Sequence, residues 1–159
     1  MPSAKKNHDD ISLNATGVAQ AQAIEPLIAA LPVKTICYSP LKRAKETKKI
    51  ACARLSVVEH EIADLTECTT EIWQKMTTMG PYARSLSEEP VYGFMQRVRR
   101  GMNEALSNEG PILIVAHGGI HWAMCCCMAV EHVWVIDNCV PVHFTISKNG
   151  QWRAQLLRK

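Results

Sequence analysis

The residues best suited to chemistry are His117, Gly118 and Gly119, which directly follow the apolar, β-branched run 112–116. That run predicts a buried strand of a parallel sheet, and the apolar segment 120–130 predicts a helix. A strand, a glycine-rich turn and a helix in this order present backbone N–H groups and a positive helix end at the sheet edge. The pattern therefore predicts an anion site with His117 at the turn.

A second strand-to-helix junction follows the predicted short strand 35–38. Ser39 and Pro40 together are a strong helix-start signal, and Arg43 stands in the first turn behind them. Because parallel strands end at one edge of a sheet, we expect Arg43 and His117 to share a crevice. An arginine there can form two parallel hydrogen bonds to a phosphate. The competing interpretation is a solvated helix face, since four lysines surround Arg43.

Segment 62–85 has weak periodicity and many Thr, Met and Gly residues, which indicates a long loop over the sheet. Loops of this length inside a compact domain are usually functional. Glu67 in this segment is a candidate general acid that overhangs the crevice. Its competing interpretation is an ordinary loop carboxylate facing water.

The remaining pattern alternates helices with strands and predicts a three-layer α/β/α domain with a mostly parallel sheet. Asn14 or Thr16 can cap the first helix, and Asn149-Gly150 predicts a C-terminal antiparallel hairpin. No repeat or linker-like change of composition divides the chain, so residues 1–159 are expected to form a single domain. The other predicted elements are helices at 17–30, 41–55 and 87–108 and strands at 57–59, 142–147 and 151–157.

Composition limits the classes of function. The 159 residues are 47% hydrophobic and carry a net charge of +3, which permits an anionic substrate but does not indicate nucleic-acid binding. Seven irregularly spaced cysteines, with no signal peptide and no long apolar span, favour a reduced, soluble, cytoplasmic protein without membrane attachment.

Four motifs follow one another along the chain: LxxxGxxQA at 13–21, SPLKRAKET at 39–47, LTE at 65–67 and VAHGG at 115–119. In this order they resemble the histidine phosphatase superfamily, the phosphoglycerate-mutase-like group. Asp137-Asn138-Cys139 and the closing hairpin extend the resemblance from about residue 7 to 157. The second and fourth motifs, each at a predicted strand-to-helix turn, are the specific ones.

The resemblance implies a phosphohistidine intermediate and a site that neutralises phosphoryl oxygens. It assigns phosphate binding to Arg43 and to His117, the second histidine of the family, and proton donation to Glu67. The turn at Gly118 adds backbone phosphate contacts, and Asn7 matches a family asparagine less closely. The family chemistry needs no metal and no cofactor.

A metal site is the less favoured interpretation of His117, His121 and Cys125, which stand at i, i+4 and i+8. The phosphatase resemblance accounts for His117 without a metal. Cys125, Cys126 and Cys127 are interpreted as small apolar residues packed in a buried helix.

The chain departs from the family at its start, where it has neither the Arg-His-Gly motif nor the first, central strand that carries the nucleophilic histidine. Counting back from Asn7 places that histidine at about Met1, and His8 lacks both a preceding strand and a following glycine. One interpretation is a truncated reading frame of an ordinary phosphatase. The other is a degenerate relative that binds phospho-ligands without turnover. Truncation is favoured, because it explains both losses at once.

The resulting functional hypothesis is a phosphatase that hydrolyses phosphomonoesters in its complete form. Its partner would be a small phosphorylated metabolite or a phosphoprotein, and exchange of a strand within a homodimer would compensate for the missing strand. The alternative hypothesis is a catalytically inactive phospho-ligand-binding or regulatory module. A mutase is disfavoured, since the chain is short and lacks the insertions of the larger mutases.

Overall fold

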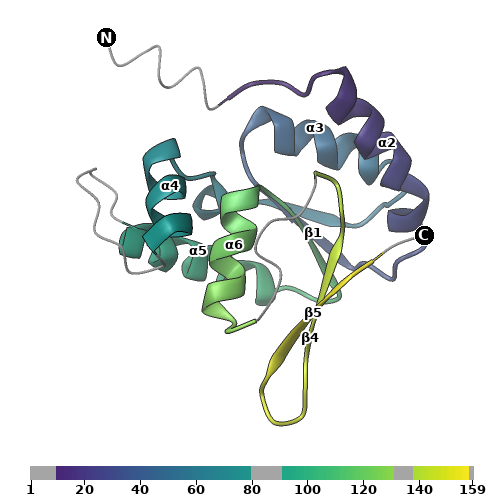
Figure 1. Cartoon of the computed structure of the whole chain (residues 1–159). Coiled ribbons are helices and arrows are strands. Elements are labelled where there is room, and N and C mark those ends of the chain that lie inside the picture. The colour runs from purple at the N-terminus through teal and green to yellow at the C-terminus, as the bar shows by residue number, and fades with distance from the viewer. Residues whose placement is uncertain (1–9, 80–90, 131–137, 158–159) are drawn as a thin grey trace.

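A computed structural model describes residues 10–79, 91–130 and 138–157 (Figure 1). Its central element is a parallel three-stranded sheet in which β1 (Thr35–Tyr38) lies between β2 (Val58–Glu61) and β3 (Ile112–Val115). A separate antiparallel pair, β4 (Val142–Ile146) and β5 (Trp152–Leu156), closes the described chain. The α/β class, the parallel sheet and the C-terminal hairpin are confirmed.

Two helices, α2 (Ala15–Ala29) and α3 (Lys42–Ala51), lie on one side of the sheet in Figure 1. The helices α4 (Thr70–Met79), α5 (Val91–Leu106) and α6 (Gly118–Cys127) lie on the other side. In α2 and α5 apolar positions recur at helical spacing along the sequence.

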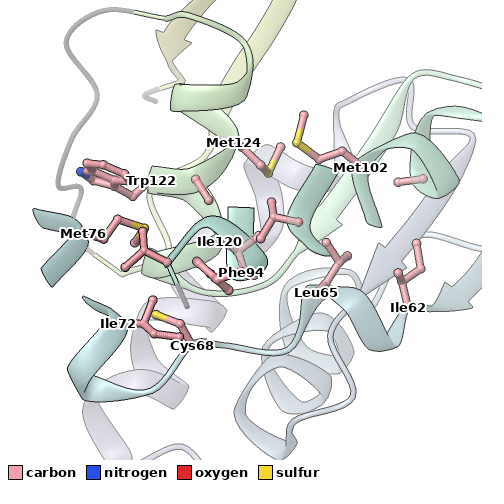
Figure 2. Packing of buried hydrophobic residues seen from close by; sticks show 14 of the residues in the cluster. Ile62, Leu65, Cys68, Ile72, Met76, Phe94, Met102, Ile120, Trp122 and Met124 are labelled. Atoms are coloured by element: carbon pink, nitrogen blue, oxygen red, sulfur yellow. The ribbon is translucent and has the colours of Figure 1, made fainter. Parts of the chain in front are cut away.

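The two faces of β3 show why both helix layers are needed. Ile112 and Ile114 pack against the core formed with α4, α5 and α6, whereas Leu113 and Val115 pack against the core beneath α2. Successive side chains of a strand point to opposite faces, so four consecutive apolar residues require cover on both sides. Figure 2 shows the first of these cores, in which Phe94 and Ile120 are fully buried.

The edge of β3 opposite β1 pairs with no strand among the described residues. All four residues of β3 are accordingly half-buried, whereas Thr35, Ile36 and Cys37 of β1 are buried. This is the edge of β3 beside which the family's first, central strand, expected to be missing from this sequence, would lie.

Local signals placed most helix boundaries close to the observed ones. Asn14, one of the two expected caps, accepts a hydrogen bond from the Gly17 N–H at 2.8 Å and begins α2. The helix expected at 41–55 is shorter in the structure, where α3 ends at Ala51. Its N-cap is Leu41, so Ser39 lies outside the helix. The predicted start of α5 falls within 80–90, outside the described residues.

The prediction of a long loop over 62–85 was wrong for most of 62–79, and residues 80–85 lie outside the described residues. A 3₁₀ turn, η1 (Ala63–Leu65), follows β2, and α4 then begins at Thr70. Ile72 and Met76, one helical turn apart, point into the core and have 0% solvent exposure each. Tertiary burial therefore stabilises a helix whose threonines and methionines give a weak sequence signal.

The C-terminal hairpin turns where the sequence predicts it. Gly150 adopts a φ of 83°, a left-handed conformation that glycine accepts without strain. Across the turn the Ser147 N–H donates to the Gln151 carbonyl at 2.8 Å. No helix in the described part of the chain is long and apolar enough to cross a membrane.

Candidate active site

Both chemistry-bearing junctions lie at the carboxyl edge of the parallel sheet. Tyr38 at the end of β1 pairs with Val115 at the end of β3, and the Ser39 N–H extends this pairing by donating to the Val115 carbonyl at 3.0 Å. The chain segments that follow, with Arg43 in α3 and His117 before α6, therefore begin side by side. This is the arrangement that the sequence predicts for two parallel strands.

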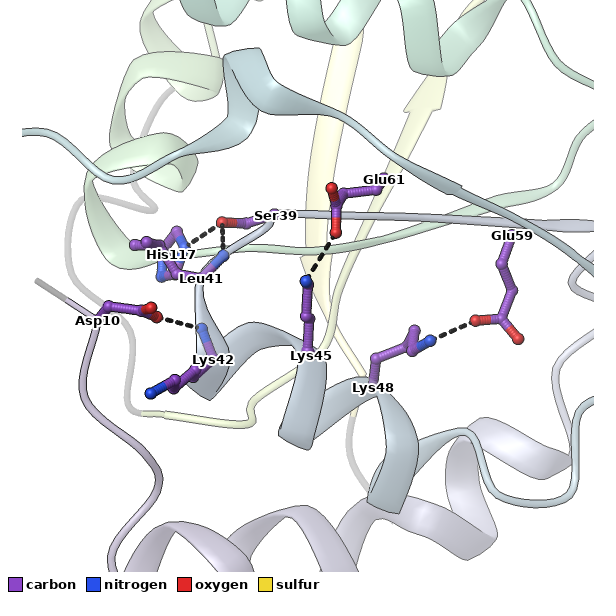
Figure 3. Close-up of polar contacts among 9 residues, drawn as sticks. All are labelled: Asp10, Ser39, Leu41, Lys42, Lys45, Lys48, Glu59, Glu61 and His117. Atoms are coloured by element: carbon purple, nitrogen blue, oxygen red, sulfur yellow. Dashed lines mark hydrogen bonds and ion pairs between the residues drawn. The ribbon is translucent and has the colours of Figure 1, made fainter.

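A hydrogen-bonded pair joins the two junctions directly. The Ser39 hydroxyl lies 2.7 Å from His117 Nε2 and also accepts the Leu41 N–H at 3.2 Å (Figure 3). Ser39 is fully buried, with 0% solvent exposure, at the point where β1 gives way to α3. In the sequence Ser39 is only a helix-start signal, so its contact with His117 was not predicted.

The surroundings of His117 disfavour its charged form. Burial, and secondly the positive charge of Arg43, lower the pKa of His117 from 6.5 to about 3. A buried imidazole loses the hydration that would stabilise an imidazolium, and a nearby guanidinium repels one. His117 is therefore neutral near pH 7, and the positive charge of Arg43 contributes to keeping it so.

Glu67 is held against the start of α6. Its Oε2 accepts the Gly119 N–H at 3.0 Å, and its Oε1 accepts the Cys68 N–H at 3.0 Å. A side chain at Gly119 would collide with this carboxylate, since a Cβ added to this residue would lie only 2.2 Å from Glu67 Oε1. Gly119 is thus required for close approach of the carboxylate rather than for backbone flexibility.

The loop that carries Glu67 is fastened from the helix beneath it. Arg97 of α5 donates through Nη1 to the Asp64 carbonyl at 2.9 Å and to the Thr66 carbonyl at 2.7 Å. Its guanidinium also lies over the ring of Phe94, 4.8 Å from the centroid. Arg97 had no motif to identify it, because its partners are backbone carbonyls more than 30 residues away in sequence.

A pocket of about 700 Å³ opens beside these groups, and Arg43, Glu67 and Gly118 are in its wall. His117 immediately precedes Gly118 in the chain, but its own side chain, which is bonded to Ser39, is not part of the wall. The rest of the wall is largely uncharged. It comprises Ile11, Ser12, Leu13, Asn14, Thr16, Gly17, Gln20, Cys68, Thr69, Thr70, Trp73, Gly119 and Asn138.

The N-terminal wall of the pocket is held to α3 by two carboxylates. Asp10 Oδ1 accepts the Lys42 N–H at 2.7 Å (Figure 3), and Glu46 Oε1 accepts the Leu13 N–H at 3.2 Å. These bonds bring segment 10–14 over the first turn of the helix that carries Arg43. The wall is therefore built from two segments about 30 residues apart in sequence.

The lysines of α3 lie in a different environment from Arg43. Lys45 forms an ion pair with Glu61 at 2.9 Å and Lys48 with Glu59 at 2.5 Å, both on the side of β2 (Figure 3). They flank a smaller hollow of about 440 Å³. The solvated-face interpretation thus fits these lysines, whereas Arg43 lines the larger pocket.

The remaining candidates are dispersed or outside the described residues. Asn7 and His8 lie outside them. His121 Nε2 is 3.6 Å from Cys125 Sγ, while the His117 ring is bonded to Ser39, and no group of three metal-ligating side chains gathers within the described ranges. Burial raises the pKa of Cys125 to about 11, which favours a packing role for this thiol.

Comparison with known proteins identifies the same family that the sequence motifs resemble. A model of the histidine phosphatase superfamily (branch 1) matches residues 3–158. No curated protein sequence matches the chain significantly.

Solved structures with the same fold include two phosphatases and the protein YhfR. The alpha-ribazole phosphatase from Shigella flexneri superposes with a TM-score of 0.71 at 20% identity, covering 95% of this chain and 87% of that one. YhfR from Bacillus stearothermophilus gives 0.71 at 15% identity, with 95% and 89% covered. A mycobacterial glucosyl-3-phosphoglycerate phosphatase gives 0.67 at 18% identity, with 92% and 88% covered. At these identities the likeness concerns the fold.

Proposed function

Because this chain belongs to the histidine phosphatase superfamily, we propose that its pocket binds the phosphoryl group of a phosphomonoester between Arg43 and His117. The ligand would be a small phosphorylated metabolite or a phosphoprotein. Hydrolysis through a phosphohistidine intermediate would belong to a form of the domain that includes a nucleophilic histidine.

The observation that carries this proposal is the convergence of Arg43, His117 and Glu67 at one edge of the sheet. Arg43 and Glu67 line the same pocket, and Arg43 acts electrostatically on His117. Phosphoryl transfer is catalysed mainly by positioning and by neutralising charge on the phosphoryl oxygens. A guanidinium supplies that charge in a fixed, bidentate geometry, and an imidazole N–H adds a directional bond.

Glu67 is suited to the leaving-group side of such a ligand. Its carboxylate is held by two backbone N–H groups in the wall of the pocket. A carboxyl group fixed in this way is positioned to exchange a proton with the oxygen that leaves the phosphorus. We therefore propose that Glu67, once its carboxylate has taken up a proton from the ligand or from water, donates that proton to the leaving oxygen in hydrolysis.

A second candidate function rests on the sequence itself, which contains no Arg-His-Gly. Without a nucleophile the remaining groups bind and orient the phosphate but do not form a covalent intermediate. The 159 residues would then act as a phospho-ligand-binding module.

Calorimetric titration with inorganic phosphate tests the shared part of both candidates. We expect Arg43→Ala to weaken binding about 10- to 100-fold, since it removes charge-assisted hydrogen bonds. Lys42→Ala is the matched control, because Lys42 is the neighbouring cation and is absent from the pocket wall. Equal effects of the two changes would refute the proposed site.

Turnover of an aryl phosphate separates the two candidates. We expect the 159-residue protein to bind phosphate and to show turnover close to the uncatalysed rate. If the wild-type protein turns over the aryl phosphate well above the uncatalysed rate and His8→Ala abolishes this activity, His8 is a nucleophile. That result would contradict the binding-module candidate.

A further inference from the structure

The Ser39 hydroxyl has a hydrogen-bond arrangement that restricts where its proton can go. Ser39 is completely buried, and its oxygen has two partners within the described residues, the Leu41 N–H and His117 Nε2. The Leu41 N–H can only donate, so it uses one lone pair of the oxygen. The hydroxyl proton then has His117 Nε2 as its remaining partner.

This arrangement distinguishes the two neutral forms of the His117 ring. If Nε2 carried a proton, it would donate to Ser39, and the buried hydroxyl would have two donors beside it and no acceptor for its own proton. An unsatisfied buried donor is costly. If Nε2 is unprotonated, it accepts the hydroxyl proton, and the Ser39 hydroxyl, the Leu41 N–H and Nε2 all have a partner. The ring proton then resides on Nδ1.

We propose that Ser39 is a positioning residue that holds His117 as the neutral Nδ1–H tautomer, so that Nδ1–H donates to an oxygen of the bound phosphoryl group. This inference rests on the proposed function and adds a residue and a protonation state to it. The same network disfavours the imidazolium, which would also require a proton on Nε2.

The fold explains why a serine at this position can act on a histidine 78 residues away. The pairing of Tyr38 with Val115 sets the relative register of the two strands, and Ser39 and His117 are the first residues beyond it whose side chains meet. Leu41 is the N-cap residue directly before α3, so its N–H orients the hydroxyl from the start of the helix. Arg43 follows within the first turn and adds the charge.

Nitrogen-15 NMR of the imidazole rings tests the tautomer directly. In the full chain at pH 7, with His117 assigned by comparison with His117→Asn, we expect a pyridine-type shift for Nε2 and a pyrrole-type shift for Nδ1. Ser39→Ala should move both shifts toward the average of exchanging tautomers and weaken inorganic phosphate binding about 5- to 10-fold. Ser39→Thr, which keeps the hydroxyl, should restore both values.

Thr35→Val is the matched control, because it removes a buried hydroxyl from β1, the strand that directly precedes Ser39. Thr35 is 3% exposed and donates to the Glu109 carbonyl at 2.8 Å, at the opposite end of β1. We expect this variant to lose stability while the His117 shifts and the phosphate affinity stay unchanged. A change of the ring shifts in Thr35→Val would mean that they report general loosening and would overturn the assignment.

Two further results would overturn the inference. One is a protonated Nε2 in the wild-type chain, a measurement that does not depend on whether any variant folds. The other is unchanged phosphate affinity in a folded Ser39→Ala protein. Failure of the proposed function gives a different pattern, in which Arg43→Ala and His117→Asn both leave phosphate affinity at the wild-type value.

Discussion

At both strand-to-helix junctions of this domain a carboxylate accepts a backbone N–H at the helix N-terminus, but the two contacts differ in burial. At the start of α3 the Lys42 N–H donates to Asp10, and at the start of α6 the Gly119 N–H donates to Glu67. In each case a carboxylate from a distant segment binds the positive end of a helix. The first contact is exposed, whereas Gly119 is buried and Glu67 is half-buried.

At each helix start one backbone N–H group is already bonded to a carboxylate of the chain, which limits what the helix ends can offer to a ligand. The sequence predicts that these groups are available to a ligand, yet at both junctions one of them already binds a carboxylate of the chain itself. Phosphate affinity should therefore depend mainly on the Arg43 and His117 side chains. Four substitutions test the difference between the junctions, beginning with the largest expected effect.

Gly119→Ala should destabilise the fold by about 3 kcal/mol, because its Cβ would displace both the Glu67 carboxylate at 2.2 Å and the Cys68 sulfur at 2.9 Å. Urea unfolding measures the effect. Gly118→Ala is the matched control, since nothing lies within 4 Å of its Cβ, and it should change stability by less than about 0.5 kcal/mol. Similar losses in both variants would show that Glu67 does not dock as described.

His117→Asn should reduce the dependence of stability on pH. The pKa of His117 is about 3 in the folded chain against 6.5 for an ordinary histidine, so between these values the unfolded state binds a proton that the folded state does not. The wild-type chain should consequently lose stability as pH falls below about 6.5.

The variant lacks this contribution. As the pH falls from 7 to 4, the unfolding free energy of the wild type should therefore drop by roughly 2 to 3 kcal/mol more than that of the variant. Urea midpoints across this range provide the measurement. Parallel pH profiles for the two proteins would contradict the low pKa.

Glu67→Gln should cost about 1 to 2 kcal/mol of stability, since the amide keeps one acceptor oxygen for the two N–H groups that the carboxylate binds. Phosphate should bind several-fold more tightly, because a negative charge is removed from the pocket wall. Weaker binding would indicate that Glu67 orients the phosphate instead of repelling it.

Asp10→Asn should have the smallest effect, about 0.5 kcal/mol, since the amide oxygen still accepts the exposed Lys42 N–H and only the charge is lost. Phosphate affinity should change by less than about twofold. An effect as large as that of Glu67→Gln would remove the proposed difference between the two junctions.

Much of the fold follows from local pattern, but not all of it. The strand at 35–38 and the hairpin at Gly150 agree with expectation because β-branched runs and turn residues act over a few positions. Helix α4 was missed, since its stability comes from burial of Ile72 and Met76 and not from its own propensity. Motifs identified Arg43, Glu67 and His117, but no local signal identified Arg97, whose role depends on carbonyls of another segment.

By itself the sequence determined the two strand-to-helix junctions and pointed to candidate phosphate-binding residues there, because strand, turn and helix signals are encoded by neighbouring residues. Tertiary structure decided how those residues are used. The bond between Ser39 and His117 joins positions 78 residues apart, and the bond between Glu67 and Gly119 joins positions 52 residues apart. Such contacts depend on strand register and on the path of the chain over the sheet, and these are set by packing of the whole domain.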